Sequence, residues 1–80
     1  MKAGKIVRKL MGMRGYTYQA LADKLGRKGA SAISNIVFRE NGMRVSSLLE
    51  MLNAMDCELV IHSKLKDKNE WVVEQGNDEE

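Results

Sequence analysis

Three short polar side chains without charge stand at helical spacing near the middle of this 80-residue chain. Ser34 and Asn35 follow Ser31 by three and four residues, so a helix would carry them on one face. Their hydroxyl and amide groups both donate and accept hydrogen bonds, as contact with the edges of nucleic-acid bases requires. The segment therefore has the chemistry of a surface that reads bases.

The charge of the chain is unevenly divided. Residues 1–46 hold ten lysines and arginines against two acidic residues, whereas residues 47–80 hold three lysines against nine acidic residues, so the halves carry +8 and −6. The polar segment lies in the basic half, and three cations bracket it: Lys28, Arg39 and Arg44. Such cations can hold phosphates without reading sequence, which favours a nucleic-acid partner. A merely solvated surface can carry the same charges, so the asymmetry is support and not proof.

Residues for catalysis or metal binding are scarce. His62 and Cys57 are the single histidine and cysteine, and the sequence has no glycine-rich phosphate loop and no cluster of metal-ligand residues. We expect His62 to be an ordinary strand residue and Cys57 to be a small buried hydrophobe in a reducing compartment. The sequence thus predicts no enzyme, no metal site and no cofactor.

The apolar segments are too short for a membrane protein. The longest unbroken apolar runs have three residues, whereas a membrane-spanning helix needs roughly 20. The N-terminal segment interleaves basic and apolar residues and lacks the continuous apolar region of a signal peptide. We expect a cytoplasmic protein without a membrane partner.

Apolar residues recur at three- and four-residue spacing in four stretches, which predicts helices over residues 2–14, 18–25, 30–38 and 45–55. Gly15 would end the first helix, and Thr17 would cap the second. The fourth helix has two candidate starts, because Val45 already fits the apolar stripe while Ser47 and Glu50 have capping-box spacing. These elements make a compact helical domain.

Beyond Asp56 the pattern changes. Residues 58–63 and 70–75 are rich in β-branched and aromatic residues around a polar stretch, which predicts a β-hairpin, and the acidic residues 76–80 are expected to be disordered. One face of the hairpin can cover the helical core. The hairpin can also cap its own monomer or pair with a second copy, and we favour the dimer because so small a domain gains most from sharing a core. Its expected interface residues are Leu59, Val60, Ile61, Trp71 and Val73.

Residues 4–55 resemble the phage repressor and Cro-like family of helix-turn-helix regulators, the xenobiotic-response-element type. The resemblance rests on residues 21–26 (LADKLG), 32–36 (AISNI) and 48–55 (LLEMLNAM). Each segment alone is an ordinary amphipathic helix, and their combination is what resembles the family. One departure is the turn at residues 27–29, which is one residue longer than the family's usual turn.

The resemblance implies a mainly α fold, a lambda-repressor-like helix-turn-helix domain of about four helices, here followed by a C-terminal β-hairpin. It also implies sequence-specific binding of double-stranded DNA. By the family's pattern, bases would be read by Ala30, Ser31 and Asn35, with Ser34 as a further candidate. Phosphate contacts would fall on Thr17, Tyr18, Gln19, Arg39, Asn41 and Arg44, to which the charge pattern adds Lys28.

Together these observations predict a homodimeric transcription regulator, a repressor of phage or bacterial origin, that inserts the helix over residues 30–38 into the major groove. Residues 1–56 would form the DNA-binding domain, residues 57–75 the dimerisation hairpin and residues 76–80 the acidic tail. A different class stays open, namely an antitoxin or another adaptor that masks a partner protein with the helical domain or the acidic hairpin. The cations around an uncharged helix favour DNA, because a pure protein binder has no need of them.

Overall fold

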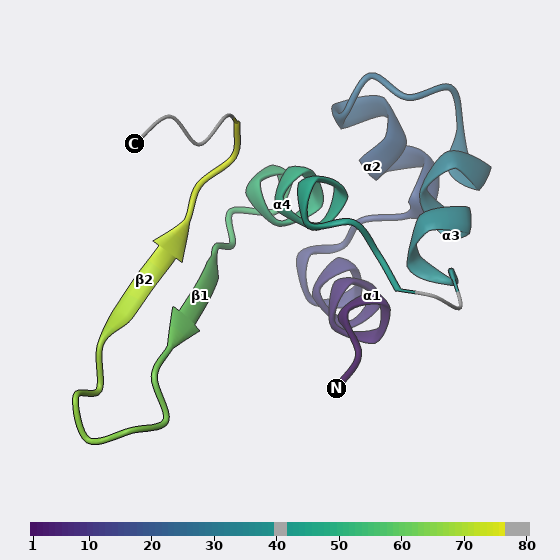
Figure 1. Cartoon of the computed structure of the whole chain (residues 1–80). Coiled ribbons are helices and arrows are strands. Elements are labelled where there is room, and N and C mark those ends of the chain that lie inside the picture. Colours follow the sequence, from purple (N-terminus) through teal and green to yellow (C-terminus); the bar gives the residue numbers. More distant parts are fainter. Residues whose placement is uncertain (40–41, 77–80) are drawn as a thin grey trace.

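The described part of the chain, residues 1–39 and 42–76 of the computed structural model, forms four helices and a two-stranded sheet (Figure 1). The elements are α1 (Ala3–Arg14), α2 (Tyr18–Lys24), α3 (Ala30–Val37), α4 (Val45–Ala54), β1 (Leu59–His62) and β2 (Glu70–Val73). The predicted mainly helical class with a C-terminal hairpin is confirmed. The expected phosphate contact of Asn41 and the expected disorder of residues 77–80 lie outside the described residues.

Two predicted helix boundaries follow local signals. Gly15 ends α1 in the left-handed conformation, with a φ of 76°, which costs a residue without a Cβ little. Thr17 then caps α2, because its Oγ1 accepts a hydrogen bond of 3.0 Å from the backbone N–H of Ala20. The turn between α1 and α2 is therefore fixed on both sides.

The start of α4 is decided by its apolar stripe. The helix begins at Val45, with Arg44 in the N-cap position and without a side-chain cap. The candidate capping box of Ser47 and Glu50 is wrong, since both residues lie inside the helix. Glu50 instead accepts a hydrogen bond from Arg27, in the turn between α2 and α3.

The core lies among the four helices. Five large side chains are buried completely or almost so: Val7, Leu21, Ile33, Met51 and Met55. Ala22 is fully buried as well, and its small side chain suits the close packing of α2 on α3. No polar or charged side chain is buried among the described residues, so the hydrophobic effect is the main force that holds the helices together.

The N-terminal turn of α1 approaches the C-terminal end of α3 at backbone distance. A Cβ placed on Gly4 would overlap the carbonyl oxygen of Val37 and lie 3.1 Å from its carbonyl carbon. Glycine is therefore the residue that lets these two helix ends touch. The contact fixes the position of α3 relative to the start of α1.

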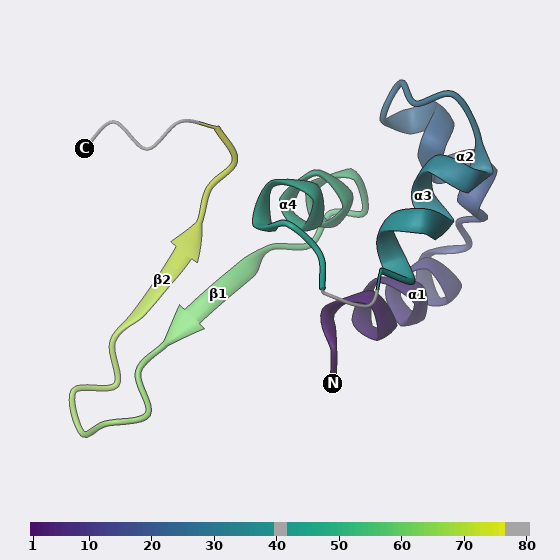
Figure 2. The ribbon, with the colours of Figure 1, turned by 45° about the vertical axis from the view of Figure 1, so that its right-hand side comes forward.

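The hairpin projects away from the helices instead of covering their core (Figures 1 and 2). Its register places apolar side chains opposite each other in three pairs, Leu59–Val73, Val60–Val72 and Ile61–Trp71. Even so, Val60, Ile61 and Trp71 are exposed by 43%, 56% and 57%. The expected cover of the core by the hairpin is wrong, because α4 already closes the core with its own buried face.

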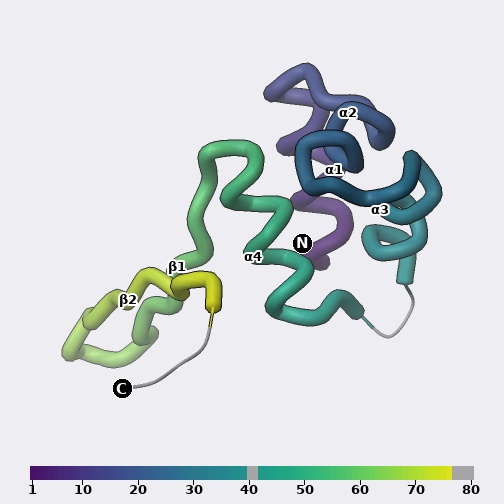
Figure 3. Tube along the Cα trace, turned by 90° about the horizontal axis from the view of Figure 1, so that it is seen from above, coloured from purple at the N-terminus to yellow at the C-terminus, as the bar shows by residue number. Residues whose placement is uncertain are grey.

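The hairpin is attached at α4, which lies between it and the other helices (Figure 3). The side-chain amide of Asn53 in α4 donates a hydrogen bond of 2.7 Å to the Oε1 of Gln75, just after β2. Val45, Leu49 and Trp71 line an open groove between α4 and β2. The chain thus has a helical body and a hairpin arm that meet along one helix.

Candidate functional site

The face of α3 that points away from the core carries the predicted base-reading residues. Ser31 and Asn35 are exposed, and Ala30 and Ser34 are half-buried. Ile33 is fully buried beneath them and fixes the helix to the body. The structure therefore brings the predicted set together on one helix, with Ser31 and Asn35 as its most accessible members.

The start of α3 is tied to α2 by Gln19, a contact that the sequence did not indicate. Its Oε1 accepts a hydrogen bond of 3.3 Å from the backbone N–H of Ala30, and its Nε2 donates one of 2.8 Å to Asp23. Gln19 was expected to contact phosphate, and in the structure its amide joins the two helices. Thr17 is likewise engaged as a helix cap and is exposed at the same end of α2.

The turn between α2 and α3 accommodates its extra residue without disturbing either helix. The backbone N–H of Arg27 donates to the carbonyl oxygen of Ala22 at 2.8 Å, and Gly29 is extended, with a φ of 176°. Ala30 then begins α3, as predicted. Arg27 also ties this turn to α4, because it forms an ion pair of 2.7 Å with Glu50 in that helix.

Lys28, Arg39 and Arg44, the cations expected at phosphates, are all exposed. Within the described residues none of them forms an ion pair. Lys28 precedes α3 and Arg39 follows it, so the two lie beyond opposite ends of its polar face. This arrangement leaves positive charge available beside an uncharged polar helix.

Two other cations serve the fold instead. Arg14 Nε donates to the carbonyl oxygen of Met55 at 3.0 Å, and Lys24 Nζ donates to that of Ala54 at 2.5 Å. These carbonyls end α4, where cations are favourable because the helix terminus carries partial negative charge. Lys24 also donates to the hydroxyl of Tyr16 at 2.7 Å, and this hydrogen bond raises the pKa of Lys24 above its usual 10.5.

Sequence reasoning missed an aromatic residue at the end of the same α3 face. Phe38 is 58% exposed although it is large and apolar. The guanidinium carbon of Arg8 lies 4.6 Å from the centre of its ring, and the ring of Tyr18 meets it edge-on, at 6.5 Å between centres. The available signal was its spacing, because Phe38 follows Ser34 by four residues and Asn35 by three.

The residues expected at a dimer interface lie on the hairpin, away from α3 (Figure 1). Val60, Ile61 and Trp71 are exposed and Leu59 and Val73 are half-buried. The structure adds Val72, which is 51% exposed. The chain therefore presents two separate surfaces, one polar and cationic on the body and one apolar on the arm.

The chain has no match among the known family models, curated proteins or solved structures with which it was compared. In the described ranges, no three His, Cys, Asp or Glu side chains are grouped so that they could hold a metal ion. No helix there is long and apolar enough to cross a membrane. The arguments for function therefore rest on the two surfaces.

Proposed function

We propose that the chain is a sequence-specific, double-stranded DNA-binding transcription regulator of the phage repressor and Cro-like helix-turn-helix type, and that it acts as a repressor. In this proposal α2 and α3 form the motif, and α3 enters the major groove. The observation that carries it is the polar, uncharged face of α3, held rigidly on α2 and accompanied by exposed cations. A recognition helix needs this combination, since side chains read bases and cations bind phosphates.

The assigned roles differ between side chains. Ser31 and Asn35 are exposed and would read base edges, with Ala30 and Ser34 beside them. Asparagine can form two hydrogen bonds with an adenine in the major groove. Lys28, Arg39 and Arg44 would neutralise phosphates, a contact that fixes position but does not distinguish sequences.

A salt titration of binding to random duplex tests the DNA proposal. If Lys28, Arg39 and Arg44 each neutralise one phosphate in both copies of a dimer, the affinity should fall with a slope of about −5 in log affinity against log salt. A flat response, or no binding at low salt, refutes it.

Two variants distinguish a residue that reads bases from a residue that binds phosphate. Asn35→Ala should cost about 1–3 kcal/mol at one base position of a half-site and leave other sequences unaffected. Arg44→Gln should weaken binding to every sequence alike and reduce the salt slope by about 0.9 per copy. Equal losses on all sequences for both variants would contradict the roles.

We further propose that a second copy covers the hairpin and that the homodimer reads a two-fold symmetric operator. Val60, Ile61, Trp71 and Val72 expose apolar surface that pairing would bury. The half-sites should lie about 34 Å apart, one turn of the double helix. Sedimentation of wild type and of Ile61→Glu tests the interface, because the glutamate should shift the protein to a monomer. An unchanged dimer would place the interface elsewhere.

The same exposed apolar hairpin supports the second candidate, an antitoxin or adaptor that masks another protein. The two candidates differ in what they need from the helical body. DNA binding depends on the α3 face and its cations, whereas a pure adaptor tolerates their replacement. The salt titration therefore also decides between the two classes.

A further inference from the structure

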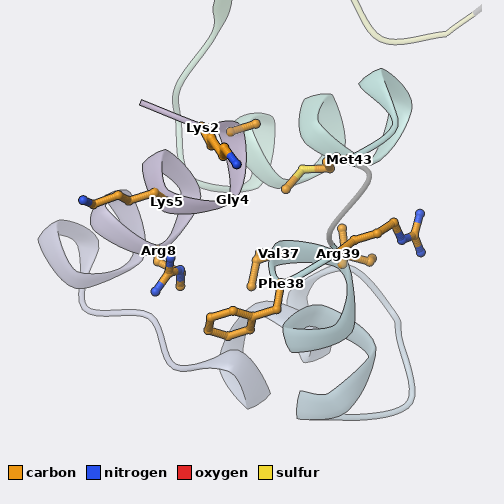
Figure 4. A pocket seen from close by; sticks show the side chains of 11 residues that line it. Lys2, Gly4, Lys5, Arg8, Val37, Phe38, Arg39 and Met43 are labelled. Carbon is orange, nitrogen blue, oxygen red and sulfur yellow. The ribbon is translucent and has the colours of Figure 1, made fainter.

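A cationic groove with an aromatic edge lies between the start of α1 and the end of α3 (Figure 4). Its volume is about 650 Å³, which is within the range of ligand-binding sites. Four cations line it, namely Lys2, Lys5, Arg8 and Arg39, and its described lining has no acidic side chain. We call these four residues together with Phe38 the Phe38 cluster.

The cations come from two segments that are held at a fixed spacing. Lys2 is the N-cap of α1, and Lys5 and Arg8 lie in the first two turns of that helix. Arg39 follows α3. The backbone contact of Gly4 with Val37 joins these two helix ends directly beneath the groove. The contact therefore holds the two segments that carry these cations next to each other, while the side chains of Lys5 and Arg39 point to opposite sides (Figure 4).

The cations at the start of α1 are unfavourable for the fold itself. The first turn of α1 has no acidic residue, and Lys2 and Lys5 lie at the end of the helix where cations are destabilising. The exposed phenyl ring of Phe38 also leaves apolar surface in water. Local features that weaken a fold in this way are typical of sites that bind something.

Phe38 connects the groove to the polar face of α3. It follows Asn35 by three residues, which is about 4.5 Å along a helix axis. Arg8 on one side and the edge of Tyr18 on another hold the ring in place. A partner that lies along α3 would therefore reach the ring and the cations around it.

We propose that the Phe38 cluster is a second contact for the same DNA and binds its sugar–phosphate backbone beside the groove that α3 reads. This inference rests on the proposed function. The cations would neutralise phosphates, and the phenyl ring would pack on a deoxyribose between them. The contact is independent of sequence, because neither phosphates nor sugars identify a base.

The salt dependence of binding to random duplex tests the cluster. Contacts of Lys2 and Lys5 would make the wild-type slope steeper than the slope of about −5 expected from Lys28, Arg39 and Arg44 alone. The double variant Lys2→Gln/Lys5→Gln should remove about 0.9 of the slope of log affinity against log salt for each lost contact, so about 1.8 per copy. The matched control is Lys66→Gln/Lys68→Gln, which removes the same charge from the loop between β1 and β2. Its slope should stay close to that of wild type.

The outcomes separate this inference from the proposed function. If wild type binds with a steep slope and both double variants behave alike, the cluster is refuted and the DNA proposal stands. If wild type itself shows no salt-dependent binding, the DNA proposal has failed and the cluster fails with it.

The proposed contact of Phe38 with the DNA backbone has its own test. Phe38→Ala should weaken binding about tenfold, as truncation of a central interface aromatic does, and by the same factor on every duplex sequence. Its thermal melting should stay close to wild type because the ring is mostly exposed. A loss confined to particular sequences would mean that Phe38 reads a base, and no loss would mean that the ring is outside the contact. Either result overturns the assigned role.

Discussion

Replacement of Gly4 by alanine should destabilise the protein, although alanine is the better helix former. The added Cβ would come closer to the carbonyl oxygen of Val37 than the 3.0 Å below which real Cβ contacts essentially never occur. The added Cβ would meet backbone atoms of Val37, so rotation of a side chain cannot relieve the overlap. The ends of α1 and α3 must move apart, and overpacking of this kind costs about 1–3 kcal/mol.

The structure contains a matched control for this change. Gly12 lies in the same helix, and a Cβ placed there would meet nothing within 4 Å. Gly12→Ala should therefore stabilise the protein by about 0.5–1 kcal/mol, because it removes the conformational freedom of glycine from a helix. The same gain is smaller at Gly4, which is close to the start of α1. We therefore expect Gly4→Ala to lower the free energy of unfolding by about 2 kcal/mol in total.

Thermal unfolding followed by circular dichroism measures both variants at one protein concentration. For a domain of this size 1 kcal/mol corresponds to roughly 4–8 °C. Gly4→Ala should lower the melting temperature by about 8–16 °C, and Gly12→Ala should raise it by a few degrees. Melting of Gly4→Ala at or above the wild-type temperature would refute the backbone contact between α1 and α3.

Three further changes probe local interactions. Thr17→Ala removes the cap of α2 and should lower the free energy of unfolding in urea by about 1 kcal/mol, whereas Thr17→Ser should stay near wild type. Glu50→Gln breaks the ion pair with Arg27, and because the two side chains are 34% and 32% exposed, the loss should stay below about 1 kcal/mol. A clearly larger loss would contradict a solvent-screened pair. Hydrogen bonding to Tyr16 raises the pKa of Lys24 above 10.5, so its stabilising contact is complete below pH 10.5 and is lost as the pH rises through the raised value. The difference in stability between wild type and Lys24→Gln should therefore disappear at high pH, and a difference that persists there would exclude this linkage.

The helices could be predicted because their signals are local. The spacing of apolar residues predicted all four helices, and Gly15 and Thr17 marked the boundary between α1 and α2. The strands were also found from composition. The position of the hairpin was not predictable, since it depends on whether α4 leaves any core surface uncovered, which is a property of the packed body and not of residues 57–75.

The candidate site was predictable only in part. The spacing of Ser31, Ser34 and Asn35 was enough to place them on one face of a helix. The roles of Gln19 and Phe38 depend on contacts between α2, α3 and α1, and local sequence does not encode such contacts.

The separation of the hairpin from the helical body has an evolutionary consequence. No residue of β1 or β2 belongs to the buried cluster that holds the helices, so mutations in the arm cost the body little stability. The apolar surface of the arm and the polar face of α3 can therefore change independently of each other. Substitutions in a few strand residues can thus alter the surface of the arm without passing through an unfolded intermediate.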